Sequence, residues 1–198
     1  MRKAVEFYFD VGSPASYLAW TQLPQLCAAA GADLVYKPML LGAVFQATGN
    51  ASPAAVPAKA RYTNRDFARH ARQYGVPFAI NPHFPIHTLF LMRAVTGVLS
   101  REPERLQALL AAVFKAIWVD GLNLNDAAVT AQMLAGAGFD PAHMHAMTSA
   151  ADVKDALKAT TQEAIDKGVF GAPTMLVGDE MFFGQDRLMQ VQEELVRA

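Results

Sequence analysis

The stretch Val5-Glu6-Phe7-Tyr8-Phe9-Asp10-Val11-Gly12-Ser13-Pro14-Ala15-Ser16 carries most of the information about the fold. Its first five residues form a mostly apolar run typical of a strand, and Asp10-Val11-Gly12 is typical of a tight turn. Ser13-Pro14 then precedes an apolar-periodic run from Tyr17 to Ala30. Serine at the N-cap followed by proline at the first helical position is a common start of a helix. The stretch therefore predicts a strand, a turn and a helix, with the Ser13 hydroxyl at the helix N-terminus.

Ser13 has two interpretations. An ordinary N-cap would explain the residue by itself. A helix N-terminus also favours negative charge, because its first N–H groups lack partners and the helix dipole is positive there. Thioredoxin-like proteins place the first cysteine of a Cys-x-x-Cys pair at this point, whereas this chain has serine at both positions, Ser13 and Ser16. If the site handles sulfur, the sulfur must arrive with a ligand.

The composition limits the class of protein. The chain has 198 residues, is 53% hydrophobic and 18% charged, and carries a formal net charge of −1. These values predict one folded domain, or one domain with a large insertion, and give no electrostatic reason to expect nucleic acid or an anionic membrane as a partner. We expect a cytoplasmic protein, because Met1-Arg2-Lys3 leads directly into a strand and no apolar run approaches the ~20 residues of a membrane span. The single cysteine, Cys27, excludes an intramolecular disulfide and is expected to be a small buried residue.

The order of the predicted elements indicates the fold class. The first helix should end near Gly31, and the alternating run 33–38 predicts a second strand that a helical crossover places parallel to the first. From residue 41 to 168 the pattern of helix-starting and helix-ending residues predicts helices and no strand. These helices are expected at 65–74 with Asn64 as cap, 88–99, 103–119, 125–136, a short one from 140, and 151–167. Strands at 173–177 and 180–183, joined by Gly178-Asp179, then read as a hairpin before a helix at 187–197.

This order predicts an α/β, thioredoxin-like fold with a large all-helical insertion between its β-α-β and β-β-α halves. The expected organisation is a thioredoxin-like domain made of residues 1–40 and 169–198, and an inserted helical subdomain made of residues 41–168.

Two further stretches carry candidate chemistry. Gly171-Ala172-Pro173-Thr174, directly before a strand, resembles the cis-proline loop of the thioredoxin fold. A cis bond there would turn the backbone of Ala172 outward, where an extended peptide could pair with it as an added strand. Gly184-Gln185-Asp186 precedes the last helix, so Asp186 is either an N-cap or a partner for the charged end of a ligand.

Taken together, these motifs resemble a known enzyme family. The segments that carry the resemblance are Phe7-Tyr8-Phe9-Asp10 with Ser13-Pro14 and Tyr17-Leu18, then 169–175, then 178–188. They are similar to 2-hydroxychromene-2-carboxylate isomerases, which resemble kappa-class glutathione transferases, and both belong to the DsbA-like branch of the thioredoxin superfamily. The resemblance implies a glutathione-dependent cis-trans isomerase. It would convert 2-hydroxychromene-2-carboxylate, or a related product of aromatic ring cleavage, to trans-o-hydroxybenzylidenepyruvate by reversible thiolate addition.

The resemblance also implies roles for individual residues. Ser13 matches the catalytic serine that hydrogen-bonds the glutathione sulfur, and Ala172 matches the position whose backbone pairs with the cysteinyl unit. Asn50 matches an asparagine that contacts glutathione in the kappa-class relatives. The segment expected to hold the γ-glutamyl end consists of Phe183, Gly184, Gln185 and Asp186.

The substrate half departs from the family pattern. Phe45 and Phe84 fall at positions where substrate contacts are expected, but Phe45 replaces a lysine and Ala55-Val56 replaces asparagine–arginine. The basic pair that follows the central loop in the isomerase is replaced here by residues around His87 and Thr88. Lys59, Arg61 and His87 are possible substitutes, although solvated positions are the simpler interpretation. The spacing of Asp140, His143 and His145 is compatible with a metal site on a short helix, but no further ligand cluster accompanies it. A solvated surface is therefore the simpler interpretation, and no metal is expected.

The expected partners are glutathione, a small aromatic carboxylate substrate and a second copy of the chain in a homodimer, with no nucleic acid and no membrane. Two alternatives stay open. One is a kappa-type glutathione transferase or peroxidase, and the other is a non-catalytic thioredoxin-fold module that binds glutathione. A dithiol oxidoreductase is excluded, because serines at positions 13 and 16 cannot cycle a disulfide.

Overall fold

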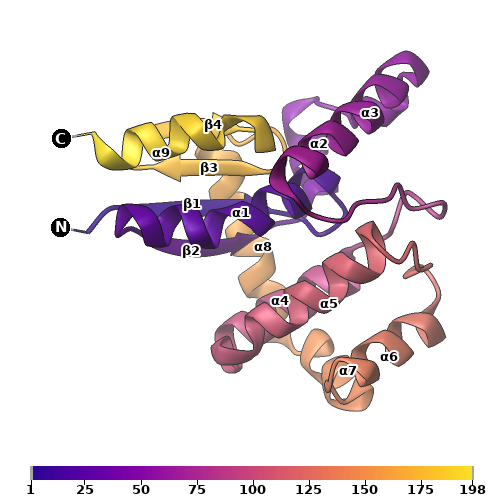
Figure 1. The fold of residues 1–198 in the computed structure, drawn as a ribbon. Helices are drawn as coiled ribbons and strands as arrows, with labels where there is room; N and C mark the ends of the chain where they lie inside the picture. Colours follow the sequence, from indigo (N-terminus) through magenta and orange to yellow (C-terminus); the bar gives the residue numbers. More distant parts are fainter. Residues whose placement is uncertain (1, 198) are drawn as a thin grey trace.

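A four-stranded mixed sheet forms the centre of the computed structural model, which describes residues 2–197. The strand order is β2-β1-β3-β4. β1 (Ala4–Phe9) runs parallel to β2 (Asp33–Pro38) and antiparallel to β3 (Thr174–Val177), and β3 pairs with β4 (Glu180–Phe183) in a hairpin. The parallel β1–β2 pair and the tight hairpin are both as the sequence predicts (Figure 1).

Helices cover both faces of this sheet. α1 (Pro14–Ala30) and α9 (Leu188–Val196) lie against one face, and α8 (Ala151–Asp166) crosses the other (Figure 1). The remaining helical segments between β2 and β3 are α2 (Leu41–Thr48), η1 (Pro53–Ala55), α3 (Pro57–Tyr74), α4 (Leu89–Arg101), η2 (Pro103–Arg105), α5 (Leu106–Trp118), α6 (Ala127–Gly136) and α7 (Pro141–Ser149), and η3 (Gln185–Arg187) precedes α9.

One large apolar core extends from the sheet into these helices. Alternate residues of β1 point to opposite faces, so Phe7 and Phe9 lie on the α1 side, where their rings stack with centroids 4.8 Å apart. The same cluster includes Leu109 and Trp118 of α5. A second, smaller cluster on the other face joins Tyr8 of β1 to Val44 of α2 and Ala164 of α8. Both clusters combine residues of the predicted thioredoxin-like domain with residues of the predicted insertion, so the division into two units stays a prediction.

The ends of α1 follow its sequence. Ser13 is the N-cap and its Oγ accepts a hydrogen bond from the Ser16 N–H at 3.2 Å, while Pro14 occupies the first helical position. Gly31 ends the helix with φ 64°, a left-handed conformation that glycine adopts without a Cβ penalty. The predicted start and end of the first helix are confirmed.

Some helix boundaries in the middle of the chain were predicted wrongly. α2 and η1 had not been expected as helices, and α3 begins at Pro57 rather than after Asn64. Pro57 suits the first helical position, and the helix formers that follow it continue through Asn64, which is interior and not a cap. The helix expected from Pro103 starts as the 3-10 turn η2, and α5 begins at Leu106.

A network of charged groups ties α8 and the turn after it to the sheet. The Tyr8 hydroxyl donates to Glu163 Oε1 at 2.8 Å, Lys37 Nζ lies 3.0 Å from the same oxygen, and Lys167 Nζ lies 2.7 Å from Glu6 Oε2. Burial acts to raise the pKa of the Glu163 carboxyl, but hydrogen bonds from Lys167, Lys37 and Tyr8 outweigh it and lower the pKa to about 2. Glu163 is therefore the ionised centre of the network at neutral pH.

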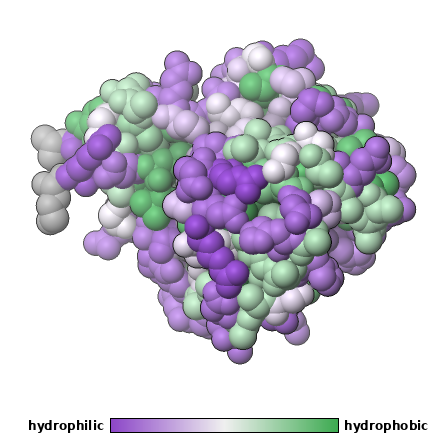
Figure 2. Space-filling view, turned by 90° about the horizontal axis from the view of Figure 1, so that it is seen from below, coloured by the Kyte–Doolittle hydropathy of each residue, from purple (hydrophilic) through white to green (hydrophobic). Residues whose placement is uncertain are grey.

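The surface has no single dominant apolar patch on the face that Figure 2 shows, and the single thiol is buried. Apolar residues on the face in Figure 2 form several separate patches among hydrophilic ones. Within residues 2–197, no helix combines the length and the apolar character needed to cross a membrane. Cys27 is buried as predicted, and burial, with a smaller effect of Asp33, raises the pKa of its thiol to about 11.

Replacing Glu163 should weaken folding in a pH-dependent way. The pKa of Glu163 is lower in the folded protein than in the unfolded chain, so the stabilisation is present above the ordinary glutamate value of 4.5 and is lost as the pH falls toward about 2. At pH 7 we expect Glu163→Gln to lower the free energy of unfolding by about 0.5–2 kcal/mol, with the deficit shrinking in acid. Urea unfolding at several pH values measures this. Glu104→Gln, at an exposed site, is the control, and an equal effect of both variants would contradict the prediction.

Candidate active site

The N-terminus of α1 meets the loop before β3 at Ser13 and Ala172. The Ser13 side chain is buried, with 5% of the residue exposed, and its Oγ donates to the Ala172 carbonyl at 3.0 Å. The Ala172–Pro173 peptide bond is cis, as the sequence indicates. Ser13 is therefore more than a helix cap, because its one hydroxyl proton links α1 to the cis-proline loop.

Few backbone donors are free at this end of α1. The Gly12 N–H donates to Asp10 Oδ1 at 2.9 Å, the Ser13 N–H to the Asp10 carbonyl at 3.0 Å, and the Ser16 N–H to Ser13 Oγ. Pro14 has no N–H. Of the N–H groups at positions 12 to 16, all described here, only that of Ala15 has no partner. An anion at this point would meet one free N–H group and the positive end of the helix dipole, beside the Ser13 hydroxyl whose proton is bound to the Ala172 carbonyl.

A buried carboxylate lies beneath the turn. Asp10 is 2% exposed, and its Oδ2 accepts from the Leu41 N–H and from Thr88 Oγ1, each at 3.0 Å, in addition to the Gly12 contact at Oδ1. Burial raises the pKa of the Asp10 carboxyl, and hydrogen bonds from Leu41, Gly12 and Thr88 act in the opposite direction. These three donors satisfy both carboxylate oxygens without a cation.

The donors to Asp10 come from the starts of different helices. Leu41 is the first residue of α2, whose N-cap Leu40 offers no side-chain cap, and Thr88 is the N-cap of α4. Thr88 also packs closely on the turn, since a Cβ placed on Gly12 would come within 2.7 Å of Thr88 Cγ2. The carboxylate of Asp10 thus fixes α2 and α4 against the N-terminus of α1.

Asn50 and Phe183 reach the cis-proline loop from two sides. Asn50 Nδ2 donates to the Phe170 carbonyl at 2.8 Å, which connects the end of α2 to the loop. The Phe170 and Phe183 rings lie with centroids 4.7 Å apart, and the Phe183 ring covers Gly171 so closely that a Cβ there would lie 2.7 Å from it. Gly184 N–H donates to the Pro173 carbonyl at 3.0 Å. These contacts bring Asn50, Phe183 and Gly184 to the loop that contains Ala172.

Asp186 is not an N-cap. η3 has Gly184 as its N-cap and α9 has Arg187, and neither has a side-chain cap, so that alternative for Asp186 is wrong. The Asp186 carboxylate is instead half-exposed, with its Oδ2 2.7 Å from Arg187 Nη1. Gln185 is buried, and its carbonyl accepts from the Tyr74 hydroxyl at 2.6 Å. Asp186 thus presents an accessible carboxylate paired with Arg187, two residues after the Gly184 N–H that bonds the cis-proline loop, while Gln185 anchors the segment to α3.

The two predicted substrate residues, Phe45 and Phe84, lie on separate segments, and their role stays a prediction. Phe45 is half-buried in α2, and Phe84 is 39% exposed with its ring centroid 6.1 Å from that of Trp118. No hydrogen bond or ring contact joins the two within the described chain. Lys59, Arg61 and His87 are exposed, which agrees with the simpler interpretation of each as solvated.

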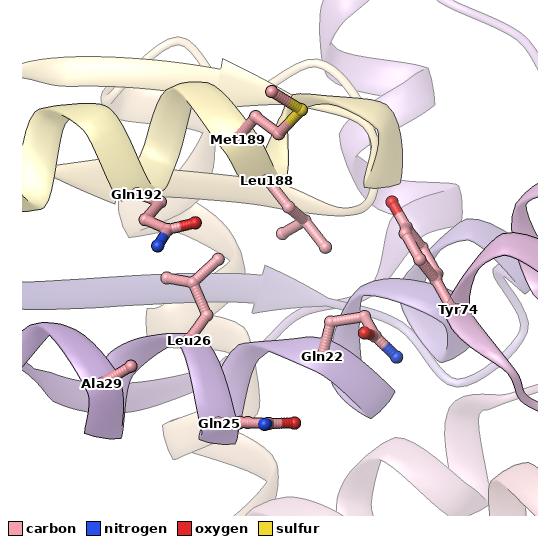
Figure 3. A pocket seen from close by; sticks show the side chains of 8 residues that line it. All are labelled: Gln22, Gln25, Leu26, Ala29, Tyr74, Leu188, Met189 and Gln192. Atoms are coloured by element: carbon pink, nitrogen blue, oxygen red, sulfur yellow. The ribbon is translucent and has the colours of Figure 1, made fainter.

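A groove of about 290 Å³ lies elsewhere, between α1, α9 and the end of α3. Figure 3 shows it lined by Gln22, Gln25, Leu26, Ala29, Tyr74, Leu188, Met189 and Gln192. None of the predicted site residues lines this groove. The candidate active site is therefore defined by contacts between α1, α2 and the cis-proline loop.

Comparisons with known proteins identify the family to which the chain belongs. The family model of the DSBA-like thioredoxin domain matches residues 4–196. A 2-hydroxychromene-2-carboxylate isomerase from Sphingobium xenophagum is 33% identical over 95% of this chain and 95% of its own length. The chain belongs to the 2-hydroxychromene-2-carboxylate isomerase family, within the DSBA-like proteins. It is therefore an enzyme, as the motifs indicated.

Other similarities agree with membership of the isomerase family. A solved structure of a 2-hydroxychromene-2-carboxylate isomerase superimposes with a TM-score of 0.83 at 30% identity, covering 96% of this chain and 93% of the other. The rat protein glutathione S-transferase kappa 1 is 28% identical over 94% of this chain and 88% of its own length. The predicted fold class and family resemblance are confirmed.

Sequence reasoning assigned no role to Asp10, Thr88 or the Leu41 N–H. A signal was present for Asp10, since an acid directly after a buried aromatic strand and before a helix start is placed to accept from backbone N–H groups. Thr88 and Leu41 had none, because only the fold brings them to residue 10.

Thr88→Val should remove one hydrogen bond to Asp10 while keeping the methyl group that packs on Gly12. A hydrogen bond to a charged group contributes roughly 1.5–3 kcal/mol, so we expect unfolding free energy to fall by about that amount. Chemical denaturation measures the change. Thr63→Val is the matched control, because the Thr63 hydroxyl bonds only carbonyls of its own helix. The prediction fails if the two variants lose equal stability.

Proposed function

We propose that the chain is a glutathione-dependent isomerase that acts on 2-hydroxychromene-2-carboxylate or a related aromatic ring-cleavage product. The observation that carries the proposal is the Ser13 hydroxyl at the N-terminus of α1, 3.0 Å from the Ala172 carbonyl, with no thiol of the chain beside it. A positive helix end that faces a peptide-binding edge and lacks its own sulfur suits an external peptide thiol.

The residues at the site fit glutathione in three respects. Ala172 offers an N–H without a partner in residues 2–197, at an edge where an extended tripeptide can pair. The free Ala15 N–H and the Ser13 hydroxyl suit an anionic sulfur. The accessible Asp186 carboxylate suits the ammonium of a γ-glutamyl unit, and Asn50 lies beside the same loop.

Bound glutathione would supply a thiolate that adds reversibly to a conjugated double bond and so permits rotation about it. Ser13 would stabilise that anionic sulfur by donating its proton, and the dipole of α1 would act in the same direction. Asp10 would keep Gly12 and Ser13 in place, since it holds the N–H groups of both. The Phe183 ring, packed against Phe170, would keep Gly171 of the cis-proline loop covered.

A kappa-type glutathione transferase is the second candidate. The exposure of Lys59, Arg61 and His87, together with the kappa-class relatives, favours it, because an aryl-pyruvate carboxylate needs a cationic or multi-donor partner. The deciding experiment supplies glutathione with a panel of chromene carboxylates and model electrophiles and identifies the products by mass spectrometry. Sulfur-free trans products support the isomerase, stable thioether adducts support the transferase, and no turnover of either substrate class contradicts both.

Ser13→Ala should reduce turnover far more than it reduces stability. The loss of a cap costs about 0.5–2 kcal/mol, whereas a hydrogen bond to an anion contributes roughly 1.5–3 kcal/mol, or about 10- to 100-fold in rate. Steady-state rates at saturating glutathione test this. Ser16→Ala is the control, because the Ser16 hydroxyl is buried without a hydrogen-bond partner in the described structure. Equal rates for Ser13→Ala and the wild type would leave Ser13 as a helix cap only.

Asp186→Asn should weaken glutathione binding without slowing the chemical step. The variant keeps the side-chain shape but removes the charge that would face the ligand ammonium, so we expect KM for glutathione to rise roughly tenfold with kcat unchanged. Asp179→Asn changes an exposed acid in the β3–β4 turn and should leave KM unaltered. A fall in kcat with constant KM would show that Asp186 does not hold the ligand.

A further inference from the structure

We propose that Ser13 acts by a hand-over of its hydrogen bond. In the free enzyme the Ser13 hydroxyl donates to the Ala172 carbonyl, and when a peptide thiol binds, the same hydroxyl donates to the ligand sulfur instead. The inference rests on the proposed glutathione site and adds to it a coupling between binding at Ala172 and stabilisation of the sulfur. The geometry that points to it is the 3.0 Å contact from Ser13 Oγ to the Ala172 oxygen.

The hydroxyl of Ser13 is fully committed in the free enzyme. A serine hydroxyl has one proton to donate, and here that proton goes to Ala172 while the oxygen accepts from the Ser16 N–H at 3.2 Å. Its own N–H is held by the Asp10 carbonyl. A sulfur anion therefore receives no hydrogen bond from Ser13 until the contact with Ala172 is broken.

Ala172 is the residue at which a bound ligand can free the Ser13 hydroxyl. At this edge of the cis-proline loop the Ala172 N–H is free among the described residues, but its carbonyl is occupied by Ser13. The next carbonyl, that of Pro173, already accepts from the Gly184 N–H. A ligand that pairs with Ala172 as an added strand brings an amide N–H to the Ala172 oxygen, and this N–H replaces the serine hydroxyl.

The exchange has opposite effects for different sulfur ligands. A ligand without a thiol also displaces the Ser13 hydroxyl from Ala172. Its thioether sulfur is a weak acceptor, however, and so replaces the lost hydrogen bond only poorly. A thiolate accepts a charge-assisted hydrogen bond and more than replaces the lost contact. Removing the hydroxyl should therefore favour thioether binding and disfavour thiolate binding.

The test compares the affinities of S-methylglutathione and glutathione by isothermal titration calorimetry. S-methylglutathione should bind Ser13→Ala roughly 2- to 10-fold more tightly than it binds the wild type, because no intramolecular hydrogen bond has to be broken. At pH 9, where the thiol ionises readily, glutathione should bind Ser13→Ala at least tenfold more weakly than the wild type. Ser16→Ala should match the wild type with both ligands.

The outcomes separate this inference from the function on which it rests. If neither ligand binds the wild type, the glutathione site itself is wrong. If both bind but S-methylglutathione binds Ser13→Ala no more tightly than the wild type, the Ala172 oxygen accepts both donors at once and the hand-over is overturned. A gain of the same size in Ser16→Ala also overturns it, because the cause would be a general loosening of the helix end.

A second measurement keeps the wild-type chain and so does not depend on the folding of a variant. An analogue of glutathione methylated on the cysteinyl nitrogen lacks the N–H that would displace Ser13. Thiolate absorbance near 240 nm should show a lowered thiol pKa for bound glutathione and a pKa near the free value, ~8.5, for the bound analogue. Equal pKa values for the two bound thiols would contradict the hand-over.

Discussion

The buried carboxylate of Asp10 is the constraint on which the site depends. Removing a charge from water is costly, and here the cost is offset by two backbone N–H groups and one hydroxyl instead of a cation. Because these donors belong to the turn before α1 and to the starts of α2 and α4, one acid sets the relative positions of three helices. Ser13 follows directly, since its N–H is bound to the carbonyl of the same aspartate.

This arrangement also limits the size of the anion that α1 can receive. A helix N-terminus with several free N–H groups suits a phosphate, which has many acceptor oxygens. Here Asp10 and Ser13 use the N–H groups of Gly12, Ser13 and Ser16, and Pro14 has none, so that Ala15 offers the only free one of this turn. A single charged atom such as sulfur matches that supply better than a polyatomic anion does.

The sequence predicted the elements that local chemistry determines. The Ser13-Pro14 start and Gly31 end of α1, the tight hairpin after Pro173 and the burial of Cys27 each follow from residue types within a few positions. The start of α3 was missed because Asn64 resembles a cap while Pro57 begins the helix without a side-chain cap. The roles of Leu41 and Thr88 at Asp10, and of Phe170 at Asn50, could not be predicted, because those contacts join distant segments.

The contact between Gly12 and Thr88 has an evolutionary consequence. Gly12 does not have the positive φ that would favour glycine, so space, and not backbone conformation, selects it. Any larger residue at position 12 would meet the methyl group of Thr88, which is itself bound to Asp10. The two positions are thus epistatic: a side chain can enter position 12 only in a lineage that has already changed residue 88 and found another donor for the carboxylate. Related sequences should therefore show the two positions covarying, with glycine at 12 tracking threonine at 88.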